Sequence, residues 1–183
     1  SAAVITVSEQ GDSVTLHIGA VDIGQGSDTI LAQMAAEAIG VTYEDMRVVA
    51  ADTETTPHDF GAYSSRQTFM AGLAVKQAGE EIRRQVIELA GQLLEVDAAG
   101  LDIDGGTVFV KGYPEKSLSF ENVASEFFVR KGPLVGKGSY TPPKLGGKFK
   151  GAPVGTSPAY SFAAQVSQVK VDEDTGQVMV TDV

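Results

Sequence analysis

The sequence predicts an α+β fold in which mixed or antiparallel sheets pack against two or three amphipathic helices. Segments with strand-like alternation open and close the chain, and segments with apolar residues at helical spacing lie between them. With 183 residues, 43% of them hydrophobic, the chain can bury one core of ordinary size. Because it stops inside an apolar, strand-like run at residues 178–183, we expect a fragment of a larger subunit.

The first two elements are a hairpin and a helix. Residues 4–8 and 14–18 alternate apolar and polar side chains on either side of Gly11, which predicts a β-hairpin. Residues 30–38 carry apolar side chains at helical spacing, and Gly40 follows them, as is typical of a helix end. One face of each element is therefore expected to be buried.

A strand, a long connection and a second helix follow. Residues 46–50 are predicted to form a short buried strand, and residues 51–63 a long polar connection. Residues 70–96 carry apolar side chains at helical spacing, which predicts a long amphipathic helix.

Two more elements precede a change in composition. The run Asp104-Gly105-Gly106 is typical of a hairpin turn. Residues 118–129 favour a third helix, which Ser117 or Ser119 would cap.

Composition divides the chain into three parts. Residues 1–130 contain the predicted helices and most of the strands. Residues 131–158 are rich in Gly, Pro and Lys and lack periodicity, which favours an extended arm with a functional or subunit-contacting role. Residues 159–183 predict a β-hairpin that continues into further sequence.

Charge and composition exclude several classes of function. The net charge of -10 disfavours nucleic-acid binding, and no apolar run approaches the ~20 residues that span a bilayer. The absence of cysteine removes thiol catalysis and iron–sulfur ligation from this chain and is compatible with a cytoplasmic location. Residues 111–150 are locally basic, which fits either a solvated loop or a contact for a polyphosphate or a partner subunit.

A glycine-rich turn precedes the first predicted helix. The run Ile23-Gly24-Gln25-Gly26-Ser27 lets backbone approach a ligand closely, and free N–H groups at a helix start attract anions. The run lacks the third glycine of a dinucleotide fingerprint and the Gly-Lys-Ser/Thr of a phosphate loop. A tight turn with Ser27 as helix cap remains the alternative.

A second polar cluster precedes the long helix. The run Ser64-Ser65-Arg66-Gln67-Thr68 gathers hydroxyls, an amide and a guanidinium at another helix start. Ordinary capping residues beside a solvated arginine are the alternative. If the two helix starts converge in space, they can grip one anionic ligand together.

Taken together, these motifs resemble the xanthine oxidase-type molybdenum hydroxylases in spacing and order. The resemblance covers nearly the whole chain, and the arm at residues 131–150 resembles only the 4-hydroxybenzoyl-CoA reductase branch. The matching segments are Ile23–Thr29, Asp52-Thr53 with Thr56-Pro57, Ser64–Thr68, Gly72, Gly151–Val154, Tyr160–Val166 and Val169–Gly176.

The resemblance implies that residues 1–130 bind a molybdenum-molybdopterin cytosine dinucleotide, with iron–sulfur clusters and FAD on companion subunits. It implies no catalytic residue and no metal ligand here, because the family's catalytic glutamate lies nearer the C-terminus of the full subunit, so the fragment alone is expected to be inactive. Tyr63 would line the substrate pocket. The cofactor-binding residues carried over by position are Ile23, Gly24, Gln25, Gly26, Ser27, Ser64, Ser65, Arg66, Gln67 and Thr68.

The resemblance also implies a reaction. Reductive dehydroxylation of an aromatic CoA thioester, 4-hydroxybenzoyl-CoA, to benzoyl-CoA is expected. Hydroxylation of an aldehyde or an N-heterocycle is the alternative within the family. A non-catalytic phosphate- or nucleotide-binding module is the alternative from another class, since the same helix starts could bind an anion without a metal.

Overall fold

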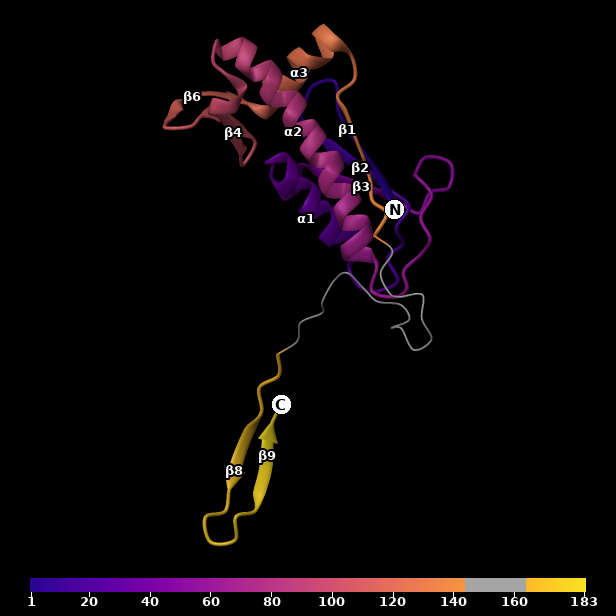
Figure 1. Cartoon of the computed structure of the whole chain (residues 1–183), viewed down its shortest axis with the longest axis vertical. Helices are drawn as coiled ribbons and strands as arrows, with labels where there is room; N and C mark the ends of the chain where they lie inside the picture. Colours follow the sequence, from indigo (N-terminus) through magenta and orange to yellow (C-terminus); the bar gives the residue numbers. More distant parts are fainter. Residues whose placement is uncertain (144–163) are drawn as a thin grey trace. The chain divides into compact units, whose positions relative to one another are not determined.

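The computed structural model describes residues 1–143 and 164–183. They divide into two compact units, Ser1–Pro142 and Pro143–Val183, and each is described by itself. Every predicted site residue lies in the first unit, which has the expected α+β composition (Figure 1).

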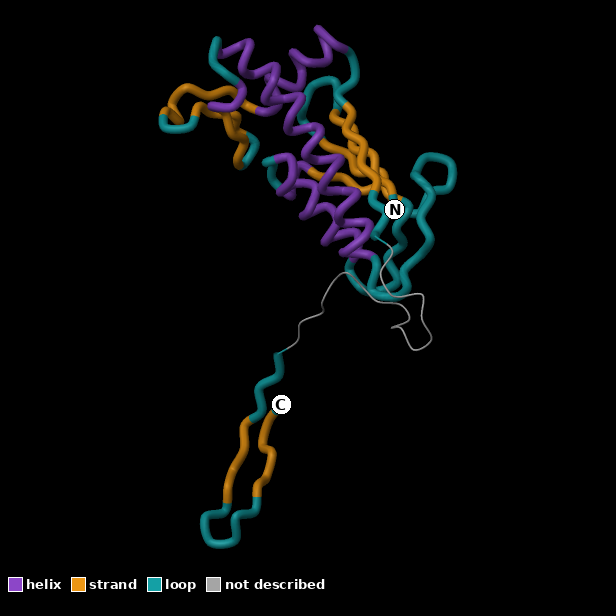
Figure 2. Tube along the Cα trace, viewed as in Figure 1, coloured by secondary structure: helices purple, strands orange, loops and turns teal. Residues whose placement is uncertain are grey.

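The first unit is built on a four-stranded mixed sheet (Figure 2). β1 runs antiparallel to β2 and to β7, whereas β2 runs parallel to β3. The predicted alternation directs Ile5, Leu16 and Ile18 into the core, which confirms the first hairpin. The strands, in the sheet order β3-β2-β1-β7, are β3 (Met46–Ala50), β2 (Val14–Ile18), β1 (Ala2–Val7) and β7 (Val135–Ser139).

The edge strand β3 is less buried than predicted. Within the described residues it pairs with β2 alone, and none of its own residues is fully buried, so the prediction of a buried strand is wrong. Met46, Val48 and Ala50 pack against the core from one side only. An apolar run of this length is found at edges as well as in sheet centres.

The strand β7 lies within the segment that the sequence assigns to an extended arm. Gly136 and Gly138 hide its strand pattern, because alternation is visible only in side chains. Both glycines face backbone atoms of α2 (Gly72–Leu94), which leaves no room for a side chain at either position. Residues 144–158 of the predicted arm lie outside the described residues.

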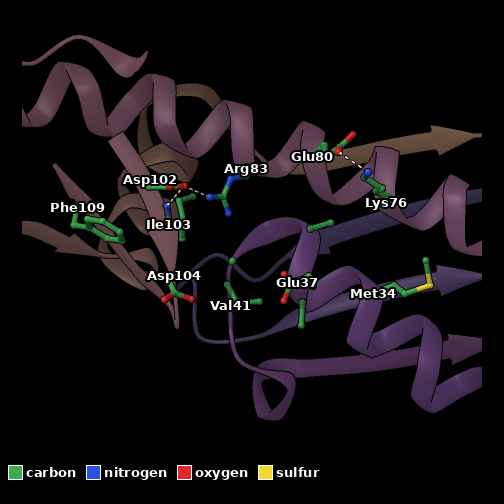
Figure 3. A pocket seen from close by; sticks show the side chains of 13 residues that line it. Met34, Glu37, Val41, Lys76, Glu80, Arg83, Asp102, Ile103, Asp104 and Phe109 are labelled. Carbon is green, nitrogen blue, oxygen red and sulfur yellow. Dashed lines mark hydrogen bonds and ion pairs between the residues drawn. The ribbon is translucent and has the colours of Figure 1, made fainter. Parts of the chain in front are cut away.

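Two helices cover the buried face of the sheet and run parallel to each other. The backbone of Gly72 lies on Met34 of α1 (Ser27–Ile39), and the backbone of Gly79 lies on Ala38. Later residues of α2 therefore lie on later residues of α1, which means that the two helices point in the same direction. In Figure 3 Met34 and Lys76 lie toward one end of the pair, and Val41 and Arg83 toward the other.

The ends of the two helices mostly agree with the sequence. Gly40 ends α1 in the left-handed conformation, as predicted. The long helix is preceded by a single π-helical turn, η2 (Gln67–Ala71), so regular α-helix begins at Gly72 rather than at Met70. Gly26, and not Ser27, occupies the N-cap of α1, and Ser27 is buried in the first turn.

A second sheet and a third helix complete the first unit. The strands β4 (Leu101–Asp104), β5 (Thr107–Val110) and β6 (Tyr113–Ser119) form an antiparallel sheet whose first turn lies at residues 105–106, as predicted. The helix α3 (Phe120–Lys131) follows, and the Ser119 Oγ accepts a hydrogen bond from the Asn122 N–H, which confirms one of the two expected caps. Short helical turns, η1 (Tyr43–Asp45) and η3 (Ala98–Gly100), connect these elements.

The second unit contains an antiparallel hairpin of β8 (Gln168–Val171) and β9 (Val178–Asp182). Gly176 lies in its turn with φ 72°. Residues 164–167 are not in a strand, and residues 159–163 are outside the described residues. Among the described helices, none has the length and apolar composition needed to cross a bilayer.

Candidate functional site

The two polar clusters lie at the same end of the helix pair. Because α1 and α2 are parallel and η2 packs against α1, the starts of both helices face one side. The loops that lead from β2 and β3 to these starts line a common cavity of about 380 Å³. Ligands of open sheets bind beyond the carboxyl ends of parallel strands, and this cavity has that position. None of the predicted site residues lines this cavity, whose lining residues are Gly19, Val21, Ala51, Thr53, Thr56, Pro57, His58 and Asp59.

The start of α1 is occupied by a carboxylate of the chain itself. The Gly24 N–H donates to Asp22 Oδ1 at 2.7 Å, and the N–H groups of Gly26 and Asp28 donate to the same carboxylate at 3.4 Å each. The hydrogen bond from Gly24 is the main cause that holds the pKa of Asp22 below its usual value. An anionic ligand must therefore replace Asp22 at these amides, which the sequence did not predict.

Gln25 closes the same turn from its other side. Its Oε1 accepts the Ile23 N–H at 2.7 Å, while its Nε2 donates to Val21 O at 3.0 Å and to Ser27 Oγ at 3.2 Å. The glycine backbone itself stays open, because a Cβ added at Gly24 or Gly26 would meet no atom within 4 Å. A ligand can approach this backbone closely even though the side chain is engaged.

The second cluster holds strained backbone at an exposed position. Ser64 and Ser65 have φ of 51° and 52°, a left-handed conformation that costs roughly 1–2 kcal/mol for each such residue. Both serines are exposed, and so is Thr68 in the following turn. Consecutive left-handed residues are typical of functional loops whose surroundings fix their conformation.

Gln67 is a buried polar side chain whose amide group makes no hydrogen bond within the described residues. It is only 9% exposed, and within the described residues neither Nε2 nor Oε1 has a hydrogen-bond partner. A buried amide without partners is costly, so it points to a ligand that supplies a donor and an acceptor.

Arg66 is directed into the protein, so the alternative interpretation of a solvated arginine is wrong. Its guanidinium is paired with Asp59, with an Nη1–Oδ1 distance of 2.9 Å, and also donates to Gly61 O at 3.0 Å. Burial raises the pKa of Asp59, but hydrogen bonds from Ser1 and Gly61 and the charge of Arg66 outweigh it and lower the pKa overall. Tyr63 stays 58% exposed, with its ring 5.4 Å from the Arg66 Cζ atom.

Two residues of these loops are not among the predicted site residues, although both carry a simple sequence signal. Asp22 and Asp59 each precede a glycine by two positions, and each accepts a hydrogen bond from that glycine N–H, Gly24 or Gly61. The pattern Asp-x-Gly is typical of turns in which the carboxylate bonds to backbone two residues later. Reading it would have identified both aspartates as internal caps.

A separate groove of about 720 Å³ lies between the far end of α1, α2 and the second sheet (Figure 3). Arg83 crosses it, pairing with Asp102 and donating to Ile39 O at 3.0 Å. None of the predicted site residues lines this groove. The predicted site residues do not line the smaller cavity either, but that cavity lies beside the helix starts that carry them, whereas the groove lies away from those starts.

Comparison with known proteins gives consistent matches. A family model described as a molybdopterin cofactor-binding domain matches residues 1–183. A putative xanthine dehydrogenase molybdenum-binding subunit of Escherichia coli K12 is 34% identical over 149 residues, which is 76% of this chain and 20% of that protein. The gamma subunit of the 6-hydroxypseudooxynicotine dehydrogenase complex of Paenarthrobacter nicotinovorans is 30% identical, covering 94% of this chain and 21% of that protein.

A solved structure is similar in fold. Quinoline 2-oxidoreductase from Pseudomonas putida 86 superposes with a TM-score of 0.71 at 30% sequence identity, covering 99% of this chain and 22% of that one. The chain thus spans about a fifth of the length of the proteins it matches.

Proposed function

We propose a function for this chain, which belongs to the molybdopterin cofactor-binding domain family. This domain is found in the molybdenum-binding subunits of xanthine oxidase-type enzymes. The proposed function is to hold the molybdenum cofactor of a multi-subunit, molybdenum-dependent oxidoreductase. The observation that carries it is the meeting of two helix starts at one end of a parallel pair, where an anionic ligand is favoured.

The donors and acceptors at this end fit such a cofactor. Gln67 is a buried amide without partners, and exposed hydroxyls of Ser64, Ser65 and Thr68 surround the same helix start. Across from them, Gly24 and Gly26 leave their backbone open to close approach. When bound, the cofactor supplies redox chemistry at molybdenum, and the protein supplies position and surroundings.

The proposed contacts are divided between the two helix starts. The residues around Gln25 bind through backbone groups after the ligand replaces Asp22, and the second start binds through side chains and backbone. Tyr63, exposed beside the left-handed serines, is proposed to line the substrate pocket. The proposed cofactor-binding residues are Ile23, Gly24, Gln25, Gly26, Ser27, Ser64, Ser65, Gln67 and Thr68, together with the backbone of Arg66.

Replacing Gln67 with leucine tests this function. Leucine has a similar volume and removes the unsatisfied amide, so the apoprotein is expected to gain about 1 kcal/mol of stability. The same change also removes the side-chain donor and acceptor that are proposed to bind the cofactor. The molybdenum retained per full-length subunit is therefore expected to fall about tenfold during dialysis.

A gain in stability together with a loss of metal identifies a binding residue, because a change at a purely structural residue lowers stability without a specific loss of metal. The matched control is Gln85→Leu on α2, whose Nε2 donates to Val135 O at 2.9 Å. That variant is expected to lose stability and keep its molybdenum. A Gln67→Leu enzyme with full molybdenum content contradicts the proposed role, and a wild-type subunit without molybdenum refutes the proposed function.

We further propose the finer identity of cofactor, partners and substrate. The cofactor is the cytosine dinucleotide form, companion subunits carry iron–sulfur clusters and FAD, and the enzyme is cytoplasmic. The substrate is an aromatic CoA thioester, in keeping with the resemblance of residues 131–150 to 4-hydroxybenzoyl-CoA reductases. Relatives named for xanthine and quinoline favour the competing proposal, hydroxylation of an N-heterocycle or an aldehyde.

A substrate panel separates these proposals. Full-length enzyme is assayed with 4-hydroxybenzoyl-CoA in the presence of a reductant. In separate assays with an oxidant, the substrate is a purine, a quinoline or an aldehyde. Turnover of the thioester alone is expected, because the basic segment complements the phosphates of coenzyme A. Turnover of a heterocycle or an aldehyde without the thioester contradicts the proposed substrate and leaves the cofactor-binding function in place.

A further inference from the structure

We propose that Arg66 is a positioning residue that shapes the loop at residues 59–66 and does not bind the cofactor with its guanidinium. It acts through Asp59, Phe60 and Tyr63, and these four residues are called the arginine clamp. The inference rests on the proposed function and departs from the family-based expectation that the Arg66 side chain grips the ligand.

Burial of the ion pair is the first observation. The Arg66 side chain is 8% exposed and that of Asp59 is 1% exposed, with 2.9 Å between Nη1 and Oδ1. Removing one partner of such a pair leaves the other charge buried without compensation, so either change alone breaks the same interaction. The two side chains are therefore expected to behave as one unit.

Closure of the loop is the second observation. The Nη1 that binds Asp59 also donates to Gly61 O at 3.0 Å, and the Gly61 N–H donates to Asp59 Oδ1 at 2.9 Å. Both peptide groups of Gly61 are thereby fixed by the ion pair. The residues between Gly61 and Arg66 are held at both ends, and they include the left-handed Ser64 and Ser65.

Coverage of the guanidinium is the third observation. Its Cζ lies 5.5 Å from the centre of the Phe60 ring and 5.4 Å from that of Tyr63, within the range of cation–π contacts. Its Nη2 lies 3.4 Å from Ser1 Oγ, which also donates to Asp59 Oδ2 at 2.6 Å. Little guanidinium surface remains for a ligand, so the charge orders the loop that carries Tyr63.

A double-mutant cycle in the full-length holoenzyme tests the clamp. The variants are Arg66→Gln, Asp59→Asn and both together, and the readout is the rate of molybdenum loss during dialysis. Each single change is expected to raise the rate about tenfold, and the double variant is expected to lie within about threefold of either one. Arg84→Gln, an exposed arginine paired with Glu88, is expected to keep the wild-type rate.

A second readout follows the position of the loop. The Mo(V) electron paramagnetic resonance spectrum of the metal retained by Asp59→Asn is expected to differ from the wild type, because Tyr63 and its neighbours shift. Should the charge variants fail to fold, Phe60→Leu, at a residue that is 68% exposed, replaces them. It is expected to raise the loss rate about threefold by uncovering the guanidinium.

Several outcomes overturn the clamp. Loss of molybdenum from Arg66→Gln but not from Asp59→Asn would show that the guanidinium itself binds the cofactor. The positioning role of Arg66 would also be refuted if the double variant lost molybdenum at a rate raised by the product of the two single effects. An unchanged Mo(V) spectrum or a wild-type loss rate for Phe60→Leu would refute it as well. A wild-type enzyme that never holds molybdenum refutes the proposed function, whereas a molybdenum-loaded wild type with uncoupled variants refutes only the clamp.

Discussion

Replacing Gly138 with alanine is expected to loosen α2 from the sheet and to destabilise this domain by about 3 kcal/mol. A Cβ at Gly138 would overlap Ala74 O and would lie 2.7 Å from Ala78 N. Both are backbone atoms of α2, so no side chain can rotate away, and the helix itself must move. Hydrogen exchange of the full-length subunit measures the effect, and α2 amides are expected to exchange about 100-fold faster.

Gly100→Ala is the matched control for this change. A Cβ at Gly100 meets no atom within 4 Å, and the residue lies outside the left-handed region. The same added methyl group should leave exchange in α2 unchanged. Equal exchange in both variants would contradict the close approach of β7 to α2.

The sequence predicts the elements of this fold better than their contacts. Alternation identifies β1 and β2, and apolar spacing identifies α1, α2 and α3, because each signal is local. β7 was missed because its glycines serve contact with a distant helix and carry no alternation. The need for glycine there comes from a neighbour more than 50 residues away in sequence.

For the candidate site, too, the sequence predicts the local motifs better than the contacts between them. The motifs around Gln25 and Ser65 mark both helix starts, but their approach to each other depends on the parallel packing of α1 and α2. Gly72 and Gly79, one heptad apart on the face toward α1, are the local trace of that packing. The internal bonding of Asp22 and Arg66 could not be read from residue type, because a charged group can equally face solvent or a partner.

Replacing Ser65 with aspartate is expected to expel the cofactor. The residue is exposed at the second helix start with φ 52°, and both Asp and Asn are well tolerated in that conformation. An added carboxylate repels an anionic ligand there, which is expected to weaken binding by about 2 kcal/mol, or roughly 30-fold. The folding of the apoprotein is not expected to suffer, since a negative charge at a helix start is favourable.

Ser65→Asn is the matched control for this charge. It has nearly the shape of aspartate and the same backbone preference, but it is neutral and carries an NH2 donor in place of one carboxylate oxygen. Any loss that both variants share measures the effect of size or of the missing hydroxyl. The difference between them measures the effect of the charge on the ligand.

The molybdenum retained per full-length subunit by Ser65→Asp, relative to Ser65→Asn, is the most direct measure of whether an anionic cofactor lies at these helix starts. At subsaturating cofactor the account predicts a ratio below about one tenth, with equal thermal stability of the two apoproteins. Equal molybdenum in the two variants would mean that no anion binds beside Ser65, and the proposed cofactor site would be wrong.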